Sequence, residues 1–583
     1  MNFIEYIKKI SLSFQANSTK AYLILTDMIL VVFAIWFSNV GILPFAKTGD
    51  FLFFIFLCLI LAIYRPGWTF VLFIGTLALE NINLAPRSFG LAIRPYQFLG
   101  ALTAIALVVQ MSMKRLPFSL PKWKWYDALP IIFAAAGFLS SLGAASKGMS
   151  FKQSAVAATF VVLYFLVRIY VQSFEDLQRI APFFISSGLV VSAYGIWQNF
   201  RFLHGGDPFE VMPGRPNGTF TEADWFGIYL VFLLAVIYTL IYMIGIERSK
   251  KQEAIGKIQN TRYNNQIISN NQISNSECLF FSDCRLRFVW NLSLVSCSLF
   301  LVILFVALIL TVSRSAWIGA VIVTLVFLKF ILLGNFFEYS RGINSKWKRF
   351  ILLLRLDMWQ WKKAGKQLLI IVIILGISIG ISSKLTRFQL AGRVESTGGL
   401  QKITIACTQG ASVPEKISNV SELGQYGCRH INLEDIEKEK NAGNFVTETY
   451  RPDPNVNVRS EIYKKSIAQI KAHPVFGIGW GSISTILGTD DRGAGLNASN
   501  IFLEVWLGSG ILGFLSFAIL LLYIMIRGMI MFLDRKTENK AIAAFVFLGW
   551  AAVIFPNLFN SGIFLGFVWA YLGVVVSLLA EKK

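Results

Sequence analysis

Long apolar blocks that recur along the 583-residue chain constrain its fold more than any other feature. Of all residues, 55% are hydrophobic and only 15% are charged, which is too little charge to cover a soluble domain. A bilayer core about 30 Å thick is crossed by about 20 mainly apolar helical residues. Such blocks occur at approximately 21–43, 50–64, 67–84, 95–113, 127–146, 152–172, 180–200, 224–246, 288–312, 315–334, 367–384, 500–527, 541–557 and 561–580. The sequence therefore predicts an all-α polytopic membrane protein with roughly 12–14 transmembrane helices.

Two details qualify the N-terminal blocks. Blocks 50–64 and 67–84 are short and share the break at Arg65-Pro66-Gly67, so they can form one re-entrant pair. The first block is long and lacks a small-residue cleavage site, which predicts an anchor rather than a cleaved signal.

The formal net charge of +21 is explained by membrane topology. With both chain ends in the cytoplasm, short connections on that side collect most Lys and Arg, as the positive-inside rule requires. These cations also attract anionic lipid head groups, and nothing in their placement calls for nucleic acid. The densest set is Lys346, Lys348, Arg349, Arg355, Lys362, Lys363 and Lys366.

The blocks and loops divide the chain into five regions. The Asn/Gln-rich loop cannot bury enough apolar surface to fold, and Trp347, Trp359 and Trp361 among cations suit a segment along the membrane surface. The regions are N-terminal transmembrane helices 1–246, a cytoplasmic Asn/Gln-rich loop 247–287, central transmembrane helices 288–384 with a basic cytoplasmic loop 335–366, a large external loop 385–499, and C-terminal transmembrane helices 500–583.

The large external loop contains two informative segments. Cys407 and Cys428 lie on the oxidising side of the membrane, where they either form a disulfide or remain two separate thiols. From 457 to 470 apolar residues recur at helical spacing, which predicts an amphipathic helix on the outer membrane surface that ends before Pro474. The Gly-rich stretch 477–481 then turns the chain back.

No soluble-enzyme motif is present, and no cofactor is expected: there is no Walker loop, no Rossmann fingerprint after a strand, no HExxH and no paired CxxC. The three histidines, His204, His430 and His473, are all assigned to the external side. Their separation does not fit metal-ligand spacing, so no metal site is expected.

Several polar residues lie at the external ends of predicted spans. Arg314, in the short turn 311–317, either extends to the lipid head groups or grips phosphate through its planar guanidinium. Arg459 begins the amphipathic helix, where it is either a ligand or a solvated surface charge.

The outer loop before the eighth span is a second candidate region. It contains Arg215 and Asn217 and ends in Glu222 and Asp224, which either bind sugar hydroxyls or cap the following helix.

Acidic residues also occur within or beside apolar blocks. Asp27 and Glu80 are expected to pair with arginines such as Arg94, and Arg168 is in a similar position on the inner side.

The order of these motifs resembles the O-antigen ligase and polymerase superfamily of bacterial envelope proteins. A Ser-Arg-small-aromatic turn is followed by a large external loop, whose Arg-led helix finishes in Pro474–Gly481; Asn500–Glu504 and Leu507–Gly513 come next. The resemblance implies a metal-independent glycosyltransferase in the bacterial inner membrane. Its relatives move a glycan from an undecaprenyl-diphosphate carrier, at the outer face, to lipid A core, another glycan or a protein.

The resemblance also implies roles for single residues. Arg314 and Arg459 match the family's basic residues that are expected to hold the diphosphate, where fixed cations stabilise the charge that grows as the sugar–phosphate bond breaks. Relatives place a His before the Asn of the H-N…E motif as general base, but here that position is Ser499, before Asn500 and Glu504.

A serine hydroxyl is a poor base at neutral pH, which leaves three explanations. Another residue, such as His473, Glu222 or Glu504, serves as base; or bond breaking runs ahead of attack; or this branch does something other than ligation.

Two other functions compete with glycan transfer. A transporter of a small anion such as bicarbonate, or of a lipid-linked sugar, is expected to show internal repeats and broken helices near the midplane. The two halves show no convincing repeat, and the candidate residues lie at the outer surface. The missing His also leaves open a non-catalytic scaffold in an envelope-assembly complex.

Overall fold

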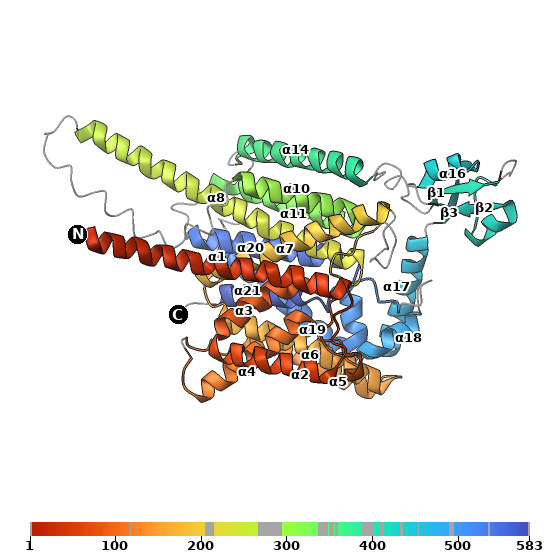
Figure 1. Ribbon diagram of the computed structural model, residues 1–583, viewed down its shortest axis with the longest axis horizontal. Helices are drawn as coiled ribbons and strands as arrows, with labels where there is room; N and C mark the ends of the chain where they lie inside the picture. Colours follow the sequence, from red (N-terminus) through yellow and green to blue (C-terminus); the bar gives the residue numbers. More distant parts are fainter. Residues whose placement is uncertain are drawn as a thin grey trace.

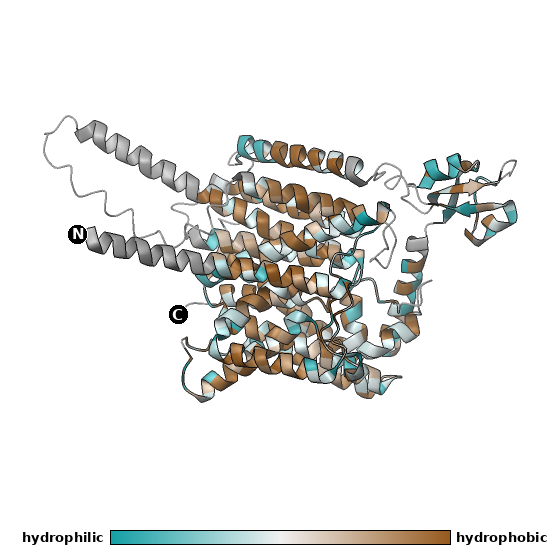
Figure 2. Cartoon of the chain, viewed as in Figure 1, coloured by the Kyte–Doolittle hydropathy of each residue, from teal (hydrophilic) through white to brown (hydrophobic). Residues whose placement is uncertain are grey.

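The computed structural model describes residues 3–116, 118–204, 215–265, 294–335, 345, 348, 355, 359–386, 400–408, 413–418, 420–431, 435–452, 454–488, 495–533 and 537–580. Within these residues, 10 helices are long and apolar enough to cross a membrane, or up to 11 if one bent pair counts as a single span. Two shorter apolar helices, Ser296–Leu310 and Gly566–Leu579, lie among them. The helices run side by side in one bundle and consist largely of hydrophobic residues (Figures 1 and 2), which confirms the all-α polytopic membrane fold.

The bundle helices keep the numbering of Figure 1. They are α1 (Phe3–Asn39), α2 (Thr48–Tyr64), α3 (Pro66–Gly75), α4 (Pro95–Ser112), α5 (Ala128–Leu142), α6 (Lys147–Tyr170), α7 (Phe174–Leu203), α8 (Ala223–Asn265), α10 (Leu294–Leu310), α11 (Arg314–Leu332), α14 (Trp361–Thr386), α19 (Ile501–Phe532), α20 (Thr537–Asn557) and α21 (Gly566–Leu579).

Burial separates central from peripheral helices. In the apolar 18-residue stretch of α8, 89% of the residues are buried inside the protein. The corresponding shares for α1 and α14 are 17% and 22%. A helix that is apolar all round belongs inside a bundle or against lipid. α8 is therefore the central helix, packed on α11 and α20, and α1 and α14 present most of their surface to lipid.

The pair α2 and α3 bends by 117° at the predicted break. Pro66 is the first residue of α3, where its missing N–H costs nothing. Block 67–84 was predicted too long. Helical structure ends with the short 3-10 turn η1 (Thr76–Ala78), and residues 79–94 form a connection that includes the turn η2 (Arg87–Phe89).

The two buried carboxylates, Glu80 and Asp27, have different partners. Glu80 pairs with Arg94 at 2.9 Å, as predicted. Asp27 was expected to pair with an arginine, but its carboxylate instead accepts a hydrogen bond from Ser187 on α7 at 3.1 Å. Asp27 is fully buried where α1 approaches Gly75 of α3, so it joins three helices through close packing.

Close to the C-terminal end of α21, whose Ser577 donates to the carbonyl of Arg168, the Arg168 side chain donates to Asp127 at 2.7 Å. Both side chains are almost fully buried, and a paired buried charge avoids the cost of an isolated one.

The large loop contains a sheet that the sequence did not predict. Strands β1 (Leu400–Cys407), β2 (Cys428–His430) and β3 (Phe445–Pro452) form an antiparallel sheet of order β2-β1-β3, with the short helix α16 (Ile436–Asn441) before β3. Cys407 and Cys428 are opposite each other in the ladder and form a disulfide. The disulfide therefore holds β1 and β2 in register.

The amphipathic helix expected over 457–470 is present as α17 (Pro454–Ala472). It lies across one end of the bundle (Figure 1), and we call this the α17 end. Ile462 is buried, whereas Val458 and Ile467 are 42% and 46% exposed. One face of α17 therefore packs on the bundle and the other remains uncovered.

Two glycine-rich motifs interlock where α17 returns to the bundle. After the turns η10 (Trp480–Ser482) and α18 (Ile483–Leu487), the chain leads on toward α19. The N–H of Ile478 donates to the carbonyl of Leu507 on α19 at 2.8 Å. A Cβ at Gly477 would overlap that carbonyl, and one at Gly508 would overlap the indole of Trp480. Only glycine permits this close approach.

The predicted block 500–527 is confirmed as α19 (Ile501–Phe532), which carries a break within it. Gly510 has φ +65°, so α19 breaks there. The N–H of Ile511 donates to the carbonyl of Val475 at 3.1 Å, in place of its bond within the helix.

Two predicted loops are only partly described. The helix α8 continues to Asn265, so the first part of the expected unfolded loop 247–287 is helical, while residues 266–293 lie outside the described residues. In the basic loop, the ring centroid of Trp359 lies 3.5 Å from the ammonium of Lys329 on α11. Trp347 lies outside the described residues.

Candidate functional site

The turn between α10 and α11 places Arg314 at the α17 end. Arg314 is the first residue of α11, and Val312, two residues earlier, has a positive φ of 51°. The indole N–H of Trp317 donates to the carbonyl of Leu308 at 3.0 Å, which ties the two sides of the turn together. The Arg314 guanidinium is half-buried at a helix N-terminus, where the backbone N–H groups also favour an anion.

Arg215 joins this turn from a distant part of the chain. Its Nε donates to the carbonyl oxygen of Thr311 at 2.9 Å, and its Nη2 lies 3.0 Å from a carboxylate oxygen of Asp224. Asp224 therefore orients Arg215 in addition to lying in the first turn of α8. The structure thus brings Arg215 to the segment that carries Arg314.

The arginine of α17 lies next to the Ser499 turn. Tyr463, one helical turn after Arg459, donates its hydroxyl to the carbonyl of Ser499 at 3.2 Å. Burial raises the pKa of Tyr463, and the positive charge of Arg459 partly opposes this rise. Arg459 and Ser499 therefore belong to one neighbourhood.

Asn500 and Glu504 shape the Ser499 turn. The Asn500 side chain accepts from the N–H groups of Phe502 and Leu503 at 2.9 and 3.2 Å, as an N-cap of α19. The carboxylate of Glu504 accepts the N–H of Ala498. These contacts hold Ser499 at a φ of +49°. Asn500 and Glu504 thus have structural roles that their sequence positions alone did not reveal.

A series of contacts between neighbouring segments runs from the Ser499 turn to the helix that begins with Arg314. The Asn500 amide donates to the carbonyl of Leu558 at 3.0 Å. Two residues earlier, Pro556 packs against Gly319 of α11, which lies about 8 Å along the helix from Arg314. Arg314, Arg215 and the Ser499 turn therefore lie at one end of the bundle, the end crossed by α17.

His473 is separated from this group. It follows the last residue of α17 and is exposed. Fourteen residues of helix place it about 21 Å from Arg459 along the axis. Its position does not support the expectation that His473 is a base beside the two arginines.

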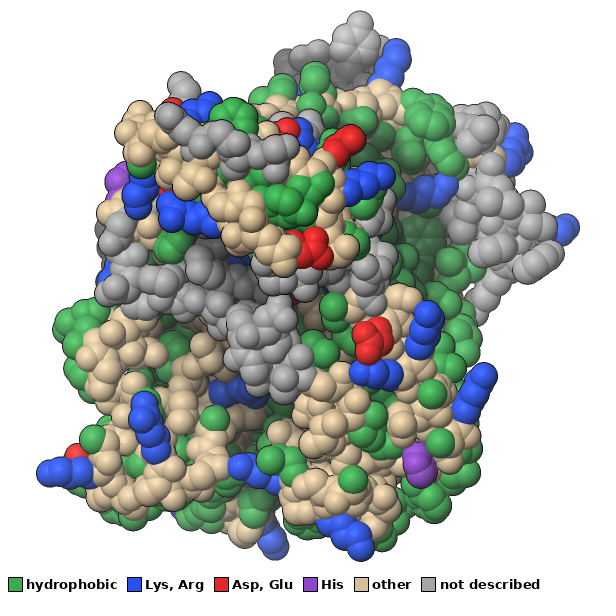
Figure 3. Space-filling model, turned by 90° about the vertical axis from the view of Figure 1, so that its right-hand side faces the viewer, with side chains coloured by type: hydrophobic (Ala, Val, Ile, Leu, Met, Phe, Trp, Pro, Cys, Tyr) green, Lys and Arg blue, Asp and Glu red, His purple; other side chains and the backbone are tan. Residues whose placement is uncertain are grey.

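The remaining charges at the α17 end are mostly basic. Figure 3 looks onto this end and shows more Lys and Arg than acidic side chains. Among the residues that the structure describes, no group of three or more His, Cys, Asp or Glu could hold a metal ion.

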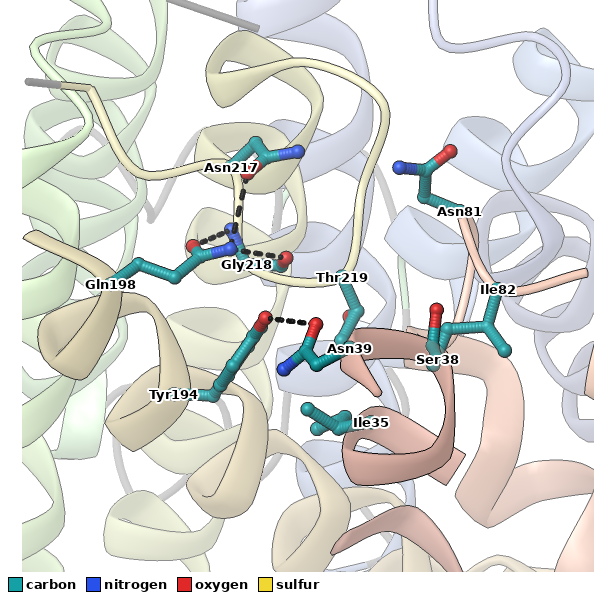
Figure 4. A pocket seen from close by; sticks show the side chains of 10 residues that line it. All are labelled: Ile35, Ser38, Asn39, Asn81, Ile82, Tyr194, Gln198, Asn217, Gly218 and Thr219. Atoms are coloured by element: carbon teal, nitrogen blue, oxygen red, sulfur yellow. Dashed lines mark hydrogen bonds between the residues drawn. The ribbon is translucent and has the colours of Figure 1, made fainter. Parts of the chain in front are cut away.

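A polar cavity of about 180 Å³ lies on the other side of the loop that carries Arg215. Side-chain amides from four segments line it, and they are Asn39, Asn81, Gln198 and Asn217 (Figure 4). The Asn217 amide donates to the carbonyl of Phe220 at 2.6 Å and accepts from Gln198 at 3.3 Å, so much of its hydrogen-bonding capacity is used within the protein. Glu222 is half-buried in the same loop.

The sequence of the central and C-terminal part identifies the family. Residues 299–518 match the family described as O-antigen ligase. This part of the chain belongs to the O-antigen ligase family. No curated protein and no solved structure was found to match the chain.

The O-antigen ligase domain supports a membrane glycosyltransferase of the ligase or polymerase type, acting in polysaccharide biosynthesis. Lipid-linked glycan substrates and a lipid A core acceptor are general features of the family. The matched region includes Arg314, Arg459 and the Ser499 turn, whereas Arg215 and the polar cavity lie before it.

Proposed function

We propose that this protein transfers a glycan from an undecaprenyl-diphosphate carrier to a lipid or glycan acceptor, without a metal. The α17 end then faces the periplasm, and both chain ends lie in the cytoplasm of the bacterial inner membrane. The observation that carries the proposal is that Arg215, Arg314 and the Arg459–Ser499 neighbourhood lie at the same end of the bundle.

Charge development during the reaction explains the use of arginine. The bond between the anomeric carbon and the diphosphate oxygen breaks, and both bonding electrons stay on the diphosphate. Fixed guanidinium groups stabilise this growing negative charge more in the transition state than in the ground state. In this proposal Arg314 and Arg459 contact the diphosphate, and Arg215 positions the Arg314 turn.

The acceptor hydroxyl forms the new bond to the anomeric carbon and loses its proton to solvent. Glu504 already accepts the N–H of Ala498, and His473 lies at the far end of α17. The proposal takes bond breaking to run ahead of attack, because a developing oxocarbenium ion needs a less activated nucleophile. Glu222 and Glu504 are the carboxylates that would act if the acceptor requires a general base.

A deletion strain provides the test. Loss of capped lipopolysaccharide with free polymer retained indicates a ligase, and loss of long chains indicates a polymerase. We expect Arg314→Ala and Arg459→Ala to abolish complementation while both proteins are inserted and stably produced. Arg314→Lys is expected to complement poorly, because an ammonium cannot present the planar fork of a guanidinium.

Lys471→Ala provides the matched control, since Lys471 is an exposed cation near the other end of α17. It should complement fully. Full activity of both arginine variants would refute the diphosphate role, and unchanged surface polysaccharide in the deletion strain would refute glycan transfer.

A further inference from the structure

The polar cavity beside the Arg215 loop has the chemistry of a carbohydrate site. Its polar lining consists of carboxamides and of hydroxyls from Ser38, Tyr194 and Thr219, with no charged residue. Carboxamides both donate and accept, which matches the alternating donors and acceptors of a sugar ring. The exposed amides of Asn39 and Asn81 present these groups to a ligand, whereas Gln198 and Asn217 bond mainly within the protein. A cavity without net charge does not select for phosphate or for an ammonium group.

Hydrogen bonds to the rest of the protein fix the floor of this cavity. Gln198 and Asn217 are 2% and 3% exposed, and the Gln198 carbonyl oxygen accepts the N–H of Gly218 at 2.8 Å. The hydroxyl of Thr219 donates to the carbonyl of Ala78. The floor is therefore preorganised, which lowers the cost of binding.

The rim carries amides that are open to solvent. Asn39 and Asn81 are both exposed, and Asn39 accepts from the Tyr194 hydroxyl at 3.1 Å. Two hydrogen bonds fix the backbone at Asn81. The backbone N–H of Asn81 donates to the carbonyl of Thr219 at 2.7 Å, and the carbonyl of Glu80 accepts from the Arg94 side chain at 2.7 Å. Figure 4 shows the Asn39 and Asn81 side chains on opposite sides of Thr219.

The cavity is joined to the arginine group by a short stretch of chain. Arg215 contacts Thr311 on one side of the loop, and two residues later Asn217 lines the cavity on the other. The Glu80–Arg94 pair next to Asn81 is internally neutralised. A ligand can therefore place its charged part near Arg215 and a neutral part among the amides.

We propose that this cavity binds a neutral, hydroxyl-bearing sugar residue of the glycan carried by the lipid-linked donor. The proposal rests on the function proposed above and adds a glycan-recognising subsite outside the matched domain. The same hydroxyl chemistry occurs in the head group of a membrane glycolipid, so the experiment must separate these two sources.

The test uses full-length protein in phosphatidylglycerol nanodiscs and measures binding by native mass spectrometry. The probes are undecaprenyl diphosphate, undecaprenyl-diphosphate oligosaccharide extracted from the producing cells, and glucosyl diacylglycerol. The variants are Asn81→Ala and Asn39→Ala at the rim, with Arg314→Ala for comparison. Asn441→Ala, an exposed amide on α16, is the matched control.

We expect each rim variant to weaken binding of the glycan-bearing carrier by about threefold to tenfold, the effect of one lost neutral hydrogen bond. Binding of bare undecaprenyl diphosphate should stay unchanged in the rim variants and fall in Arg314→Ala. Equal loss for both carriers, or no loss for either, would overturn the glycan subsite. Loss confined to glucosyl diacylglycerol would also overturn it, in favour of a lipid head-group site.

These outcomes are separable from failure of the proposed function. If Arg314→Ala leaves bare-carrier binding intact, the diphosphate role is wrong, whatever the rim variants do. Because Asn39 and Asn81 are exposed, their replacement should not impair folding, and the thermal unfolding midpoint of each variant checks this.

Discussion

The Nε of Arg215 donates to the carbonyl oxygen of Thr311 at 2.9 Å, and Thr311 lies three residues before Arg314. This contact joins the loop before α8 to the turn before α11, which are separated by almost a hundred residues of sequence. Arg215 also pairs with Asp224, so its orientation is fixed from two directions. The position of Arg314 therefore depends on a residue outside the matched O-antigen ligase domain.

Replacing Arg215 with alanine should reduce glycan transfer by about 10- to 100-fold, because a shift on the order of 1 Å in a binding group can cost roughly 100-fold. Transfer by membranes containing the variant would be compared with Arg87→Ala, which removes an exposed cation from η2. Equal activity of Arg215→Ala and the control would show that the Thr311 contact does not position Arg314.

Ser499→Ala should retain glycan transfer within about threefold of the unaltered protein. A general base accelerates a reaction by about 100-fold or more, so the rate of the alanine variant would fall by at least that factor if Ser499 were the base. Ser499→Gly should also remain active, since glycine adopts the φ of +49° without strain. Initial rates at saturating donor would show whether Ser499 is a general base or only a part of the turn.

Glu504→Gln should remain folded and largely active, because its amide oxygen still accepts the N–H of Ala498. Glu504→Leu leaves that buried N–H without its partner, at a cost of about 1–3 kcal/mol. We therefore expect only the leucine variant to unfold at a lower temperature and to lose transfer. Inactivity of a stably folded Glu504→Gln would instead assign the carboxylate a chemical role.

Gly508→Ala should destabilise the protein by about 1–3 kcal/mol, because the added methyl group overlaps the indole of Trp480 in a close-packed interface. Thermal unfolding in detergent, followed by size-exclusion chromatography, measures this effect. Gly380→Ala on α14 is the matched control, since a Cβ there meets open space. Identical unfolding temperatures would mean that the two glycine motifs do not interlock as described.

Membrane spans could be predicted because about 20 consecutive apolar residues are enough to specify one. The Glu80–Arg94 pair was predictable for a related reason, since a buried charge needs a partner. The sheet of the large loop was not predictable, because the 3-residue strand β2 pairs with β1 across a stretch of 20 residues and has no periodicity of its own.

The candidate site was only partly predictable. The sequence selected Arg314, Arg459 and Ser499, but it could not show that Arg215 contacts Thr311 or that Tyr463 contacts Ser499, because both contacts depend on the packing of distant helices. The Gly-rich stretch 507–513 within an apolar block was the available signal for the break at Gly510. The sequence marked Asn217 of the amide-lined cavity as a candidate substrate-binding residue, but it did not mark the other three amides, because the lining residues come from four separate segments.

The interlock between Gly477 and Leu507 makes the C-terminal end of α17 the fixed end of a lever. Arg459 lies about 21 Å from that end, so a tilt of about 10° would displace its backbone by about 4 Å. Such a displacement exceeds the length of a hydrogen bond. A rotation of this size about the pivot would break the contact between Tyr463 and Ser499 and would uncover Ile462. The packing of α17 on the bundle therefore holds Arg459 in place.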